Sequence, residues 1–579
     1  MRLLASTVFL ALLAACTVTT TGAPCSSDMN CPSDQGCGND GKCGPEALAC
    51  PGHTTAGECI PGTSCLGGEL VTCTAAGGVC STGPVPAANT CTQLDATQCS
   101  ATGEQVLRCK PFVTGSACLS WQAETGCAAS SLLCIAGACV CPANSGPEYV
   151  ADAVNGSAGG SPPNPTGLAS PLACRYRTIT DALTAANGHG SGSTVRAAGW
   201  SASLPGGVVL FSEPGALSIG AGVTLTTDDA VPAIGHYAIT TAAALTGAFV
   251  TMAPGSSVSG FELRNEASTG AGVLTDCPTA SDIGPGTLST VRIAAASSGT
   301  PIVRFASGVH LTGYCPVSMT GVTIADAVTG ILAEAEAPTT MTGGAVTGNG
   351  TGVSIGAAGA AAPSFSATGT AFRSNTGDAV YVARGGLFSD ACPFETNGTH
   401  VHAQPVGGAA VSVTVQNSSG IAKMTGATNS AFRLLAMGSG SVLSLLNNAI
   451  TGNDATQSYN VVSGLRRGGG VVLTAPFPGT ATIHGNGFYG NKWDQVLIAA
   501  DLPESLSIGG DSLCGNTSNS FACYDPSNPS VGLYSNGASV NAAWNHWTRQ
   551  PGVFSVDVAG TGVSGYDTFA CPAATITCP

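Results

Sequence analysis

Two histidines, His400 and His402, lie two residues apart in a segment predicted to be a β-strand. Residues i and i+2 of a strand point to the same side of a sheet, so the two imidazoles could hold one metal ion. A protein metal site also needs a third ligand, and the sequence offers none at a matching offset. The two histidines are therefore predicted to lie on an exposed polar face, and neither a metal nor a cofactor is expected.

Aromatic side chains are the second kind of residue that could bind a ligand, because their faces stack on sugar rings. Most of them are expected in the core or at a cap, since aromatic residues are readily buried. Three of them join the two histidines in the predicted set of binding residues, which is Tyr381, His400, His402, Tyr489 and Trp493.

A motif of one apolar residue, one variable residue, one small residue and Asn recurs six times. Its asparagines are Asn349, Asn375, Asn397, Asn453, Asn491 and Asn516. Their successive spacings are 26, 22, 56, 38 and 25 residues, and the two long intervals allow an insertion or a coil that lost the motif. Repeats of this length, rich in short strands, are typical of a parallel β-helix, whose coils bury their inward residues only by stacking.

The repeated asparagines have two interpretations. They could hydrogen-bond from coil to coil as a structural ladder, or they could reflect turn preference alone. A β-sandwich array is the rival fold, but it would show two-residue hairpin turns and has no reason to repeat one motif in every unit. An all-β parallel β-helix of about sixteen coils is therefore expected.

Catalysis on a polysaccharide requires carboxylates that converge on one face, near a base or around a calcium ion. Aligning the coils on the asparagine motif places Asp378 six residues after Phe372, but the equivalent position after Val346 is Gly352. Asp454 has no carboxylate at the equivalent position of another aligned coil. Because the carboxylates do not stack, no catalytic residue is predicted.

Residues 176–183, Tyr-Arg-Thr-Ile-Thr-Asp-Ala-Leu, resemble the opening of exported right-handed parallel β-helix proteins. The resemblance covers roughly residues 147–500 and implies that a helix caps the N-terminal end of the solenoid. Ile179, Leu183 and Ala186 have the spacing of such a helix. The family includes polysaccharide lyases and hydrolases beside proteins of unknown function, so the fold does not decide the activity.

Gly188-His189-Gly190 is similar to a motif of polygalacturonase-type hydrolases on this fold. In those enzymes paired aspartates precede the motif, whereas here the pair Asp228-Asp229 follows it by some forty residues. His189 is therefore predicted to lie in a turn rather than in an active site.

Cysteine usage divides the chain. Seventeen of the 26 cysteines lie between Cys25 and Cys141, which predicts small disulfide-rich modules, and residues 63–73 and 97–109 look like two copies of one module. The number of cysteines after Cys16 is odd, so either one thiol is free or a bridge joins the two regions. Connectivity does not follow from spacing.

The chain begins with Arg2, an apolar run from Leu3 to Leu13, and Leu13-Ala14-Ala15-Cys16. The apolar run is too short to span a bilayer and fits a secretory signal. The end of the run resembles the lipobox of bacterial lipoproteins, in which the cysteine becomes the acylated first residue. The resemblance implies a lipid anchor at Cys16, with the membrane as partner, at the bacterial outer membrane or cell surface.

Composition excludes one class of partner. The chain has 33 acidic and only 18 basic side chains, for a net charge of −15. Nucleic-acid binding is carried by clustered Lys and Arg, so no nucleic acid is expected. Only 9% of the residues are charged, and 80 are glycine, which suits a surface of small uncharged polar groups.

The predicted organisation has five parts. They are a signal peptide over 1–15, an acylated tether over 16–24, disulfide-rich modules over 25–141, a Gly/Ser/Pro-rich linker or loop over 142–171, and the β-helix with both caps over 172–579. The expected function is non-enzymatic binding of a glycan or another surface component. The alternatives are a lyase or glycoside hydrolase acting on an acidic polysaccharide, and a protein-binding adhesin or scaffold.

Overall fold

The computed structural model describes segments of residues 35–153, most of 174–454 and segments of 467–571. The predicted signal peptide, the predicted tether with Cys16, and Asn516 lie outside these residues. The chain divides into two units, Met1–Val140 and Cys141–Pro579. Among the helices that the structure describes, none is long and apolar enough to cross a membrane.

The first unit consists of short antiparallel sheets. Its strands are β1 (Gln35–Cys37) with β2 (Cys43–Pro45), β3 (Gly62–Leu66) with β4 (Glu69–Cys73) and β5 (Cys80–Pro84), β6 (Thr97–Cys99) with β7 (Gln105–Pro111) and β8 (Leu119–Gly126), and β9 (Leu133–Ile135) with β10 (Ala138–Val140). The two segments predicted to be copies of one module lie in the two three-stranded sheets. A disulfide joins Cys91 to Cys109, and Cys99 is also disulfide-bonded.

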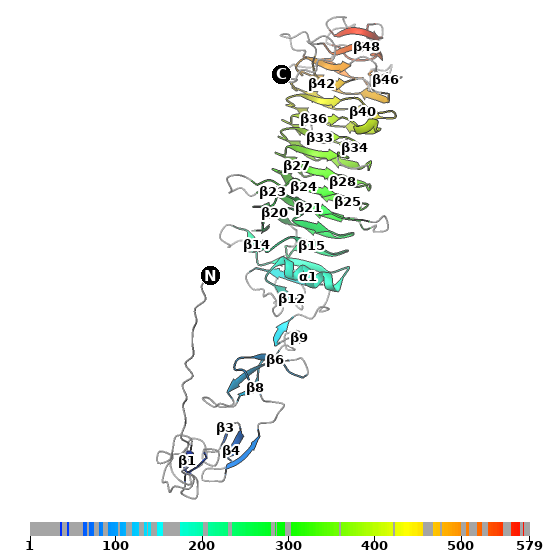
Figure 1. Cartoon of the computed structure of the whole chain (residues 1–579). Helices are drawn as coiled ribbons and strands as arrows, with labels where there is room; N and C mark the ends of the chain where they lie inside the picture. The colour runs from blue at the N-terminus through cyan, green and yellow to red at the C-terminus, as the bar shows by residue number, and fades with distance from the viewer. Residues whose placement is uncertain are drawn as a thin grey trace, which may run out of the picture. The chain divides into compact units, whose positions relative to one another are not determined.

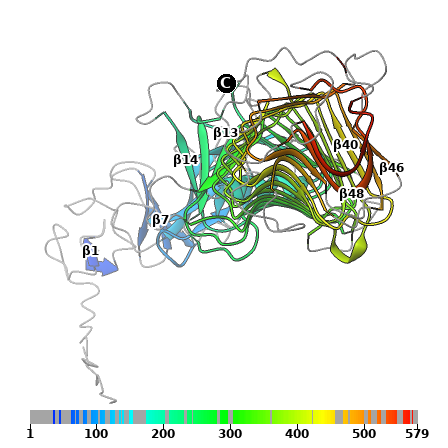
Figure 2. The ribbon, with the colours of Figure 1, turned by 90° about the horizontal axis from the view of Figure 1, so that it is seen from above.

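The second unit is a parallel β-helix, as the sequence predicts, and its coils stack along one axis (Figures 1 and 2). Each complete coil contributes one strand to each of three faces, which we call A, B and C in chain order. Faces A and B belong to one 27-stranded sheet, and face C is a 12-stranded sheet. The expected sixteen coils are therefore too many for the described residues, because long loops take up part of the chain.

Face A contains β15 (Leu217–Ile219), β18 (Val250–Met252), β21 (Ala271–Thr275), β24 (Ser307–Leu311), β27 (Thr329–Ala333), β30 (Thr351–Ile355), β33 (Asp378–Val382), β36 (Thr399–Ala403), β39 (Ser430–Leu434), β42 (Gly468–Leu473) and β45 (Asp494–Ile498). Face B contains β11 (Glu148–Asp152), β13 (Thr194–Ala198), β16 (Thr224–Thr227), β19 (Ser257–Ser259), β22 (Gly286–Ser289), β25 (Val317–Thr320), β28 (Thr339–Thr342), β31 (Ser364–Thr368), β34 (Gly385–Asp390), β37 (Val411–Gln416), β40 (Val442–Leu446), β43 (Thr480–His484) and β46 (Ser505–Ser507).

Face C contains β14 (Val209–Glu213), β17 (Tyr237–Thr241), β20 (Phe261–Asn265), β23 (Arg292–Ala295), β26 (Thr323–Ala325), β29 (Ala345–Thr347), β32 (Ala371–Arg373), β35 (Phe394–Glu395), β38 (Met424–Thr425), β41 (Ala449–Thr451), β44 (Gly487–Tyr489) and β47 (Ser520–Ala522). A 3₁₀ turn, η5 (Val406–Gly408), follows β36. The long β48 (Leu533–Asn541) pairs with β45 and β46, and β49 (Val558–Ser564) pairs with β48.

Like residues stack from coil to coil in the core. Ile331, Val353, Val380, Val401 and Phe432 are register partners on five successive coils of face A, and each is fully buried. Because alternate residues of a strand face opposite sides, one side chain from each strand enters this column while its neighbours face outward. Stacking of this kind gives each coil the apolar contacts that it cannot make alone.

The N-terminal end is capped by α1 (Ile179–His189), beside β12 (Cys174–Tyr176), as the resemblance implies. Thr178 is the N-cap and accepts a hydrogen bond from the Asp181 N–H. The buried Glu213 carboxylate accepts further bonds from the N–H groups of Ile179 and Thr180, at 2.9 and 3.0 Å. These bonds satisfy backbone donors that the first turn of a helix leaves free.

The predicted linker needs a correction at its start. Residues 148–152 form β11, which pairs in parallel with β12 and β13. This strand is only five residues long and its flanks are rich in Gly and Pro, so the sequence pattern did not predict it as a strand of the first coil. The solenoid therefore begins before residue 172.

Candidate functional site

The predicted asparagine ladder is present in the described coils, at the turn from face C to face A. Asn349 donates from Nδ2 to Oδ1 of Asn375 at 3.1 Å, and Asn375 donates to Asn397 at 2.9 Å. Asn453 donates to Asn491 at 2.8 Å. All five side chains are buried, and each Nδ2 also donates to a backbone carbonyl of the preceding coil. The ladder is therefore structural, and simple turn preference is insufficient to explain it.

The small residue of the motif has a backbone reason. Gly348, Gly452 and Gly490 have φ near +60°, and Ser374 and Thr396 have φ of 54° and 52°. This left-handed conformation favours glycine and is costly for bulky residues. The turn therefore selects a small residue one position before each asparagine.

His400 does not belong to an exposed face, and that prediction is wrong. Its imidazole is fully buried, with Nδ1 at 3.2 Å from Asn397 Nδ2 and Nε2 at 3.0 Å from Asn453 Oδ1. In the intervening coil, Ala427 occupies the ladder position and donates its N–H to Asn453. One coil between Asn397 and Asn453 has therefore lost the motif, which explains the interval of 56 residues between these two asparagines. His400 links the two asparagines across that coil.

The chemistry of His400 follows from these partners. Asn397 Nδ2 can only donate, so His400 Nδ1 accepts and Nε2 holds the proton that is donated to Asn453. Burial lowers the pKa of His400 to about 3, against the opposing effect of its bond to Asn453. The side chain is therefore neutral at physiological pH and has a structural role.

A second ladder, absent from the predictions, lies at the turn from face B to face C. Asn448 donates from Nδ2 to Oδ1 of Asn486, Asn486 donates to Asn519, and Asn519 donates to Asn545, at 3.0 to 3.1 Å, and all four are buried. Ile483-His484-Gly485-Asn486 fits the sequence motif, so this part of the second ladder could have been predicted from the sequence.

His402 and Tyr381 come together on the outside of face A. The strand register aligns Tyr381, His402 and Arg433 on three successive coils. His402 Nδ1 lies 2.8 Å from Oδ2 of Asp378, and the rings of Tyr381 and His402 meet edge to face at 5.2 Å. We call these four residues the Asp378 cluster.

The Asp378 carboxylate affects the pKa of two other members of the cluster, Tyr381 and Arg433. Burial raises the pKa of Tyr381, and the negative charge of Asp378 raises it further. Burial lowers the pKa of Arg433, and the same carboxylate opposes that shift. Tyr381 and Arg433 are half-buried, whereas the His402 side chain is only 9% exposed. The cluster therefore places a half-buried aromatic ring and a half-buried guanidinium beside an Asp–His pair, in which the Asp378 side chain is 23% exposed.

His400 and His402 do not share a side, because His400 bonds to the buried ladder asparagines whereas His402 bonds to Asp378 on the outside of face A. No group of three metal-binding side chains occurs among the residues described.

The other two binding candidates lie elsewhere. Tyr489 is on face C, where burial raises the pKa of its hydroxyl and Ser520 bonds to it. Trp493 precedes β45, and the guanidinium carbon of Arg467 lies 4.8 Å from its ring centroid. His189, at the end of α1, has its Nδ1 2.9 Å from Ser193 Oγ. The predicted set is therefore not one site.

The cysteine count is explained in part. Cys277 and Cys315 form a disulfide within the solenoid, and Cys392 is a buried free thiol. Cys523 and Cys571 are disulfide-bonded.

The chain was compared with family models, curated proteins and solved structures. No family model and no curated protein matches the chain. Among solved structures, full-length tailspike protein 2 from Escherichia coli O157:H7 bacteriophage CAB120 matches with 9% identity and a TM-score of 0.28. The match covers 83% of this chain and 55% of the tailspike chain, so the chain spans little more than half of that protein. A likeness with this TM-score is too weak to support an inference about fold or function. The assignment of a parallel β-helix rests on the strand pairing itself.

Proposed function

We propose that the protein is an exported, lipid-anchored surface protein whose β-helix binds polysaccharide at the Asp378 cluster without cleaving it. The observation that carries the proposal is the alignment of Tyr381, His402 and Arg433 around one carboxylate on three successive coils. Binding residues placed on packed strands are held more precisely than residues on loops.

The chemistry of the cluster suits a sugar. The Tyr381 ring offers an apolar face to the C–H groups of a pyranose, while its hydroxyl donates only a long bond, 3.4 Å, to the carbonyl of Gln404. Arg433 supplies a half-buried guanidinium, a group whose planar N–H donors suit hydroxyl or carboxylate oxygens. Asp378 accepts bonds from hydroxyl groups.

The anchor is proposed from the first sixteen residues alone. Each buried methylene of an acyl chain contributes about 0.8 kcal/mol, so two or three chains on Cys16 would hold the protein stably at a membrane. Mass spectrometry of the mature N-terminus tests this part: an acylated Cys16 supports it, and an unmodified N-terminus elsewhere refutes it.

Native affinity electrophoresis tests the binding proposal. The full chain is run through gels that contain neutral or acidic polysaccharides, and the polymer is stained afterwards. We expect retardation with intact polymer, and we expect Tyr381→Ala and Arg433→Gln to lose it. The matched controls are Tyr489→Ala and Arg373→Gln on face C, which should keep it.

A lyase is the second candidate, because Nε2 of His402 is buried without a hydrogen-bond partner while Nδ1 faces Asp378. A carboxylate that accepts from Nδ1–H leaves Nε2 as the basic nitrogen. That nitrogen could remove the proton beside a uronate carboxylate, so that a C=C bond forms and the C–O bond to the leaving sugar breaks. Non-catalytic binding is favoured because Nε2 is closed to solvent. Cleared polymer in the same gels would contradict that preference, and absence of both effects would favour a protein partner.

A further inference from the structure

Part of the outer surface of face B is made of hydroxyl groups. On six consecutive coils, strands β16, β19, β22, β25, β28 and β31 place Thr or Ser at both of two outward positions, from Thr224 and Thr226 on β16 to Ser366 and Thr368 on β31. Inward residues between them, such as Leu288 and Met319, are fully buried. None of the outward positions in this set, which we call the hydroxyl array, is charged or aromatic.

The array is in register in both directions. Ser318 lies between Thr287 and Thr340, and Thr320 lies between Ser289 and Thr342, and no register shift occurs along these strands. Neighbouring strands are about 4.8 Å apart, and alternate residues of a strand are about 6.6 Å apart. The hydroxyls therefore form a rectangular lattice, and threonine holds its hydroxyl firmly because its χ1 is restricted.

The hydroxyls are partnered at one end of the array only. Ser257 donates to Thr224 at 3.0 Å, and the hydroxyls of Thr226 and Ser259 are 2.7 Å apart. From Thr287 onward the array residues make no side-chain hydrogen bond to another described residue, and several of them are exposed. Their donors and acceptors are free for a ligand.

The other faces of the same coils show that composition alone does not produce the array. Face C carries Glu262, Arg264 and Arg292 in charge pairs on its outer side. The outward column of face A includes Leu274 and His310. On these coils the uniform, uncharged pattern is found on face B, and it ends at Arg196 on one side and at Phe388 and Asp390 on the other.

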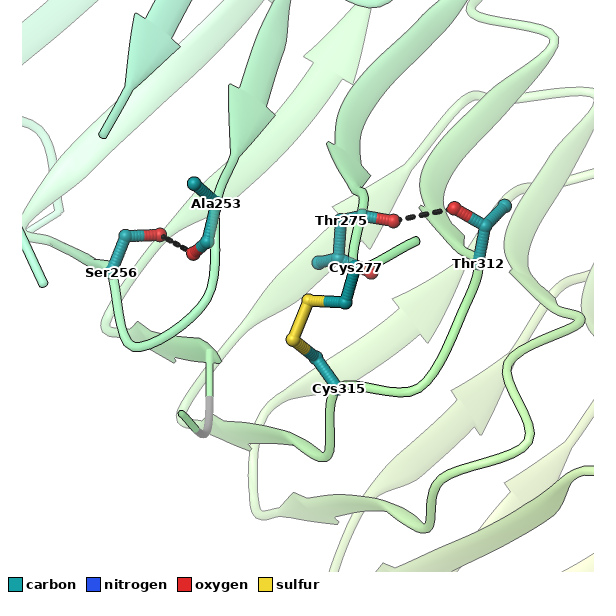
Figure 3. The surroundings of a disulfide bond; sticks show 6 residues. All are labelled: Ala253, Ser256, Thr275, Cys277, Thr312 and Cys315. Atoms are coloured by element: carbon teal, nitrogen blue, oxygen red, sulfur yellow. Dashed lines mark hydrogen bonds between the residues drawn. A yellow bond between two sulfur atoms is a disulfide. The ribbon is translucent and has the colours of Figure 1, made fainter. Parts of the chain in front are cut away.

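A covalent clamp fixes the edge of the array. The Cys277–Cys315 disulfide joins two consecutive coils at the turn from face A to face B, and Cys315 lies two residues before the start of β25 (Figure 3). Beside it, Thr312 donates to the carbonyl of Thr275 at 2.6 Å. The disulfide and this hydrogen bond help to keep successive strands of the array in register.

We propose that the hydroxyl array binds the surface of ice. A ligand that pairs with hydroxyls spaced regularly along two axes must itself repeat along two axes, and one glycan chain repeats along one only. Hexagonal ice repeats at distances close to both spacings of the array. Charges and aromatic rings, which sugar sites use and which disrupt an ice-like water layer, are missing from these positions. This proposal concerns face B and does not depend on the Asp378 cluster of face A.

The test measures thermal hysteresis and inhibition of ice recrystallisation by the purified full chain. The variant Thr342→Lys places a long charged side chain on an exposed position of the array, and we expect loss of both activities. The matched control is Thr347→Lys on face C of the same coil, which should keep both. Equal melting temperatures for the two variants exclude unfolding as the cause.

Three outcomes would overturn the proposal. They are no effect of the unmodified chain on ice, equal ice activity in Thr342→Lys and Thr347→Lys, and capture of the chain by crystalline cellulose or chitin through the array without any effect on ice. The last outcome would assign the array to a crystalline polysaccharide instead.

Discussion

Replacing Asn375 by alanine should open the solenoid locally, because this side chain lies in the middle of the first ladder. Its Oδ1 accepts from the N–H and the Nδ2 of Asn349, at 3.2 and 3.1 Å. Its Nδ2 donates to the carbonyl of Val346 and to Oδ1 of Asn397, at 3.1 and 2.9 Å. Alanine would remove all four bonds at a site that is closed to water.

The magnitude follows from the groups left without partners. Asn397 Oδ1 keeps the bond from the backbone N–H of residue 375, so it is not orphaned. The Asn349 N–H, one proton of its Nδ2 and the Val346 carbonyl lose a partner, and each buried group costs about 1–3 kcal/mol. Partial relaxation reduces the sum, so we expect a loss of about 3–6 kcal/mol in the free energy of local opening.

Native-state hydrogen exchange measures this loss. Peptides from 345–355 should exchange at least about a hundredfold faster in the variant, since each 1.4 kcal/mol is a factor of ten. The matched control is Asn429→Ala, which removes a half-exposed asparagine whose side chain makes no hydrogen bond to the described residues. Exchange changes of the same small size in both variants would refute the structural role of the ladder.

Three further predictions concern the histidine of the ladder, the cap and the disulfide. Because burial lowers the pKa of His400 to about 3, below the roughly 6.5 of an unfolded histidine, the unfolded chain binds the extra proton between these values, so stability should fall as pH drops from about 6.5 towards 3. Urea midpoints should show less of this fall in His400→Gln, and an equal fall would contradict the assignment. Glu213→Ala removes the acceptor of two helix N–H groups and should cost about 2–4 kcal/mol in urea unfolding, with unchanged stability as the contrary result. Replacing both Cys277 and Cys315 by alanine should cost about 2–4 kcal/mol in urea unfolding, and a stability equal to that of the oxidised parent chain would contradict a stabilising role of the bond.

The fold was predictable because the signals that specify it are local and repeated. The turn from face C to face A demands a left-handed residue, and a buried asparagine follows it, so the motif recurs around Asn349, Asn375 and Asn453. The helix at Ile179–His189 was predictable from its apolar spacing and its Thr178 cap. Strand β11 was missed because five residues without a repeated neighbour carry too little pattern.

The candidate site was predictable only in part. Tyr381 and His402 were chosen by residue type, but Asp378 and Arg433 join them only through coil register, which the variable loop lengths conceal. His400 was misplaced because its burial depends on contacts with Asn397 and Asn453 on different coils, which the spacing of the two histidines does not reveal. The sequence contains every residue of the cluster, and the missing information was the alignment of coils.

Hydroxyl-radical footprinting of the full chain with a retained polysaccharide tests the central claim most directly. The account predicts that bound polymer protects Tyr381 from oxidation while Tyr314, which is 39% exposed on a distant coil, reacts as before. Protection of Tyr314 or Tyr489 with no change at Tyr381 would contradict the assignment of glycan binding to the Asp378 cluster.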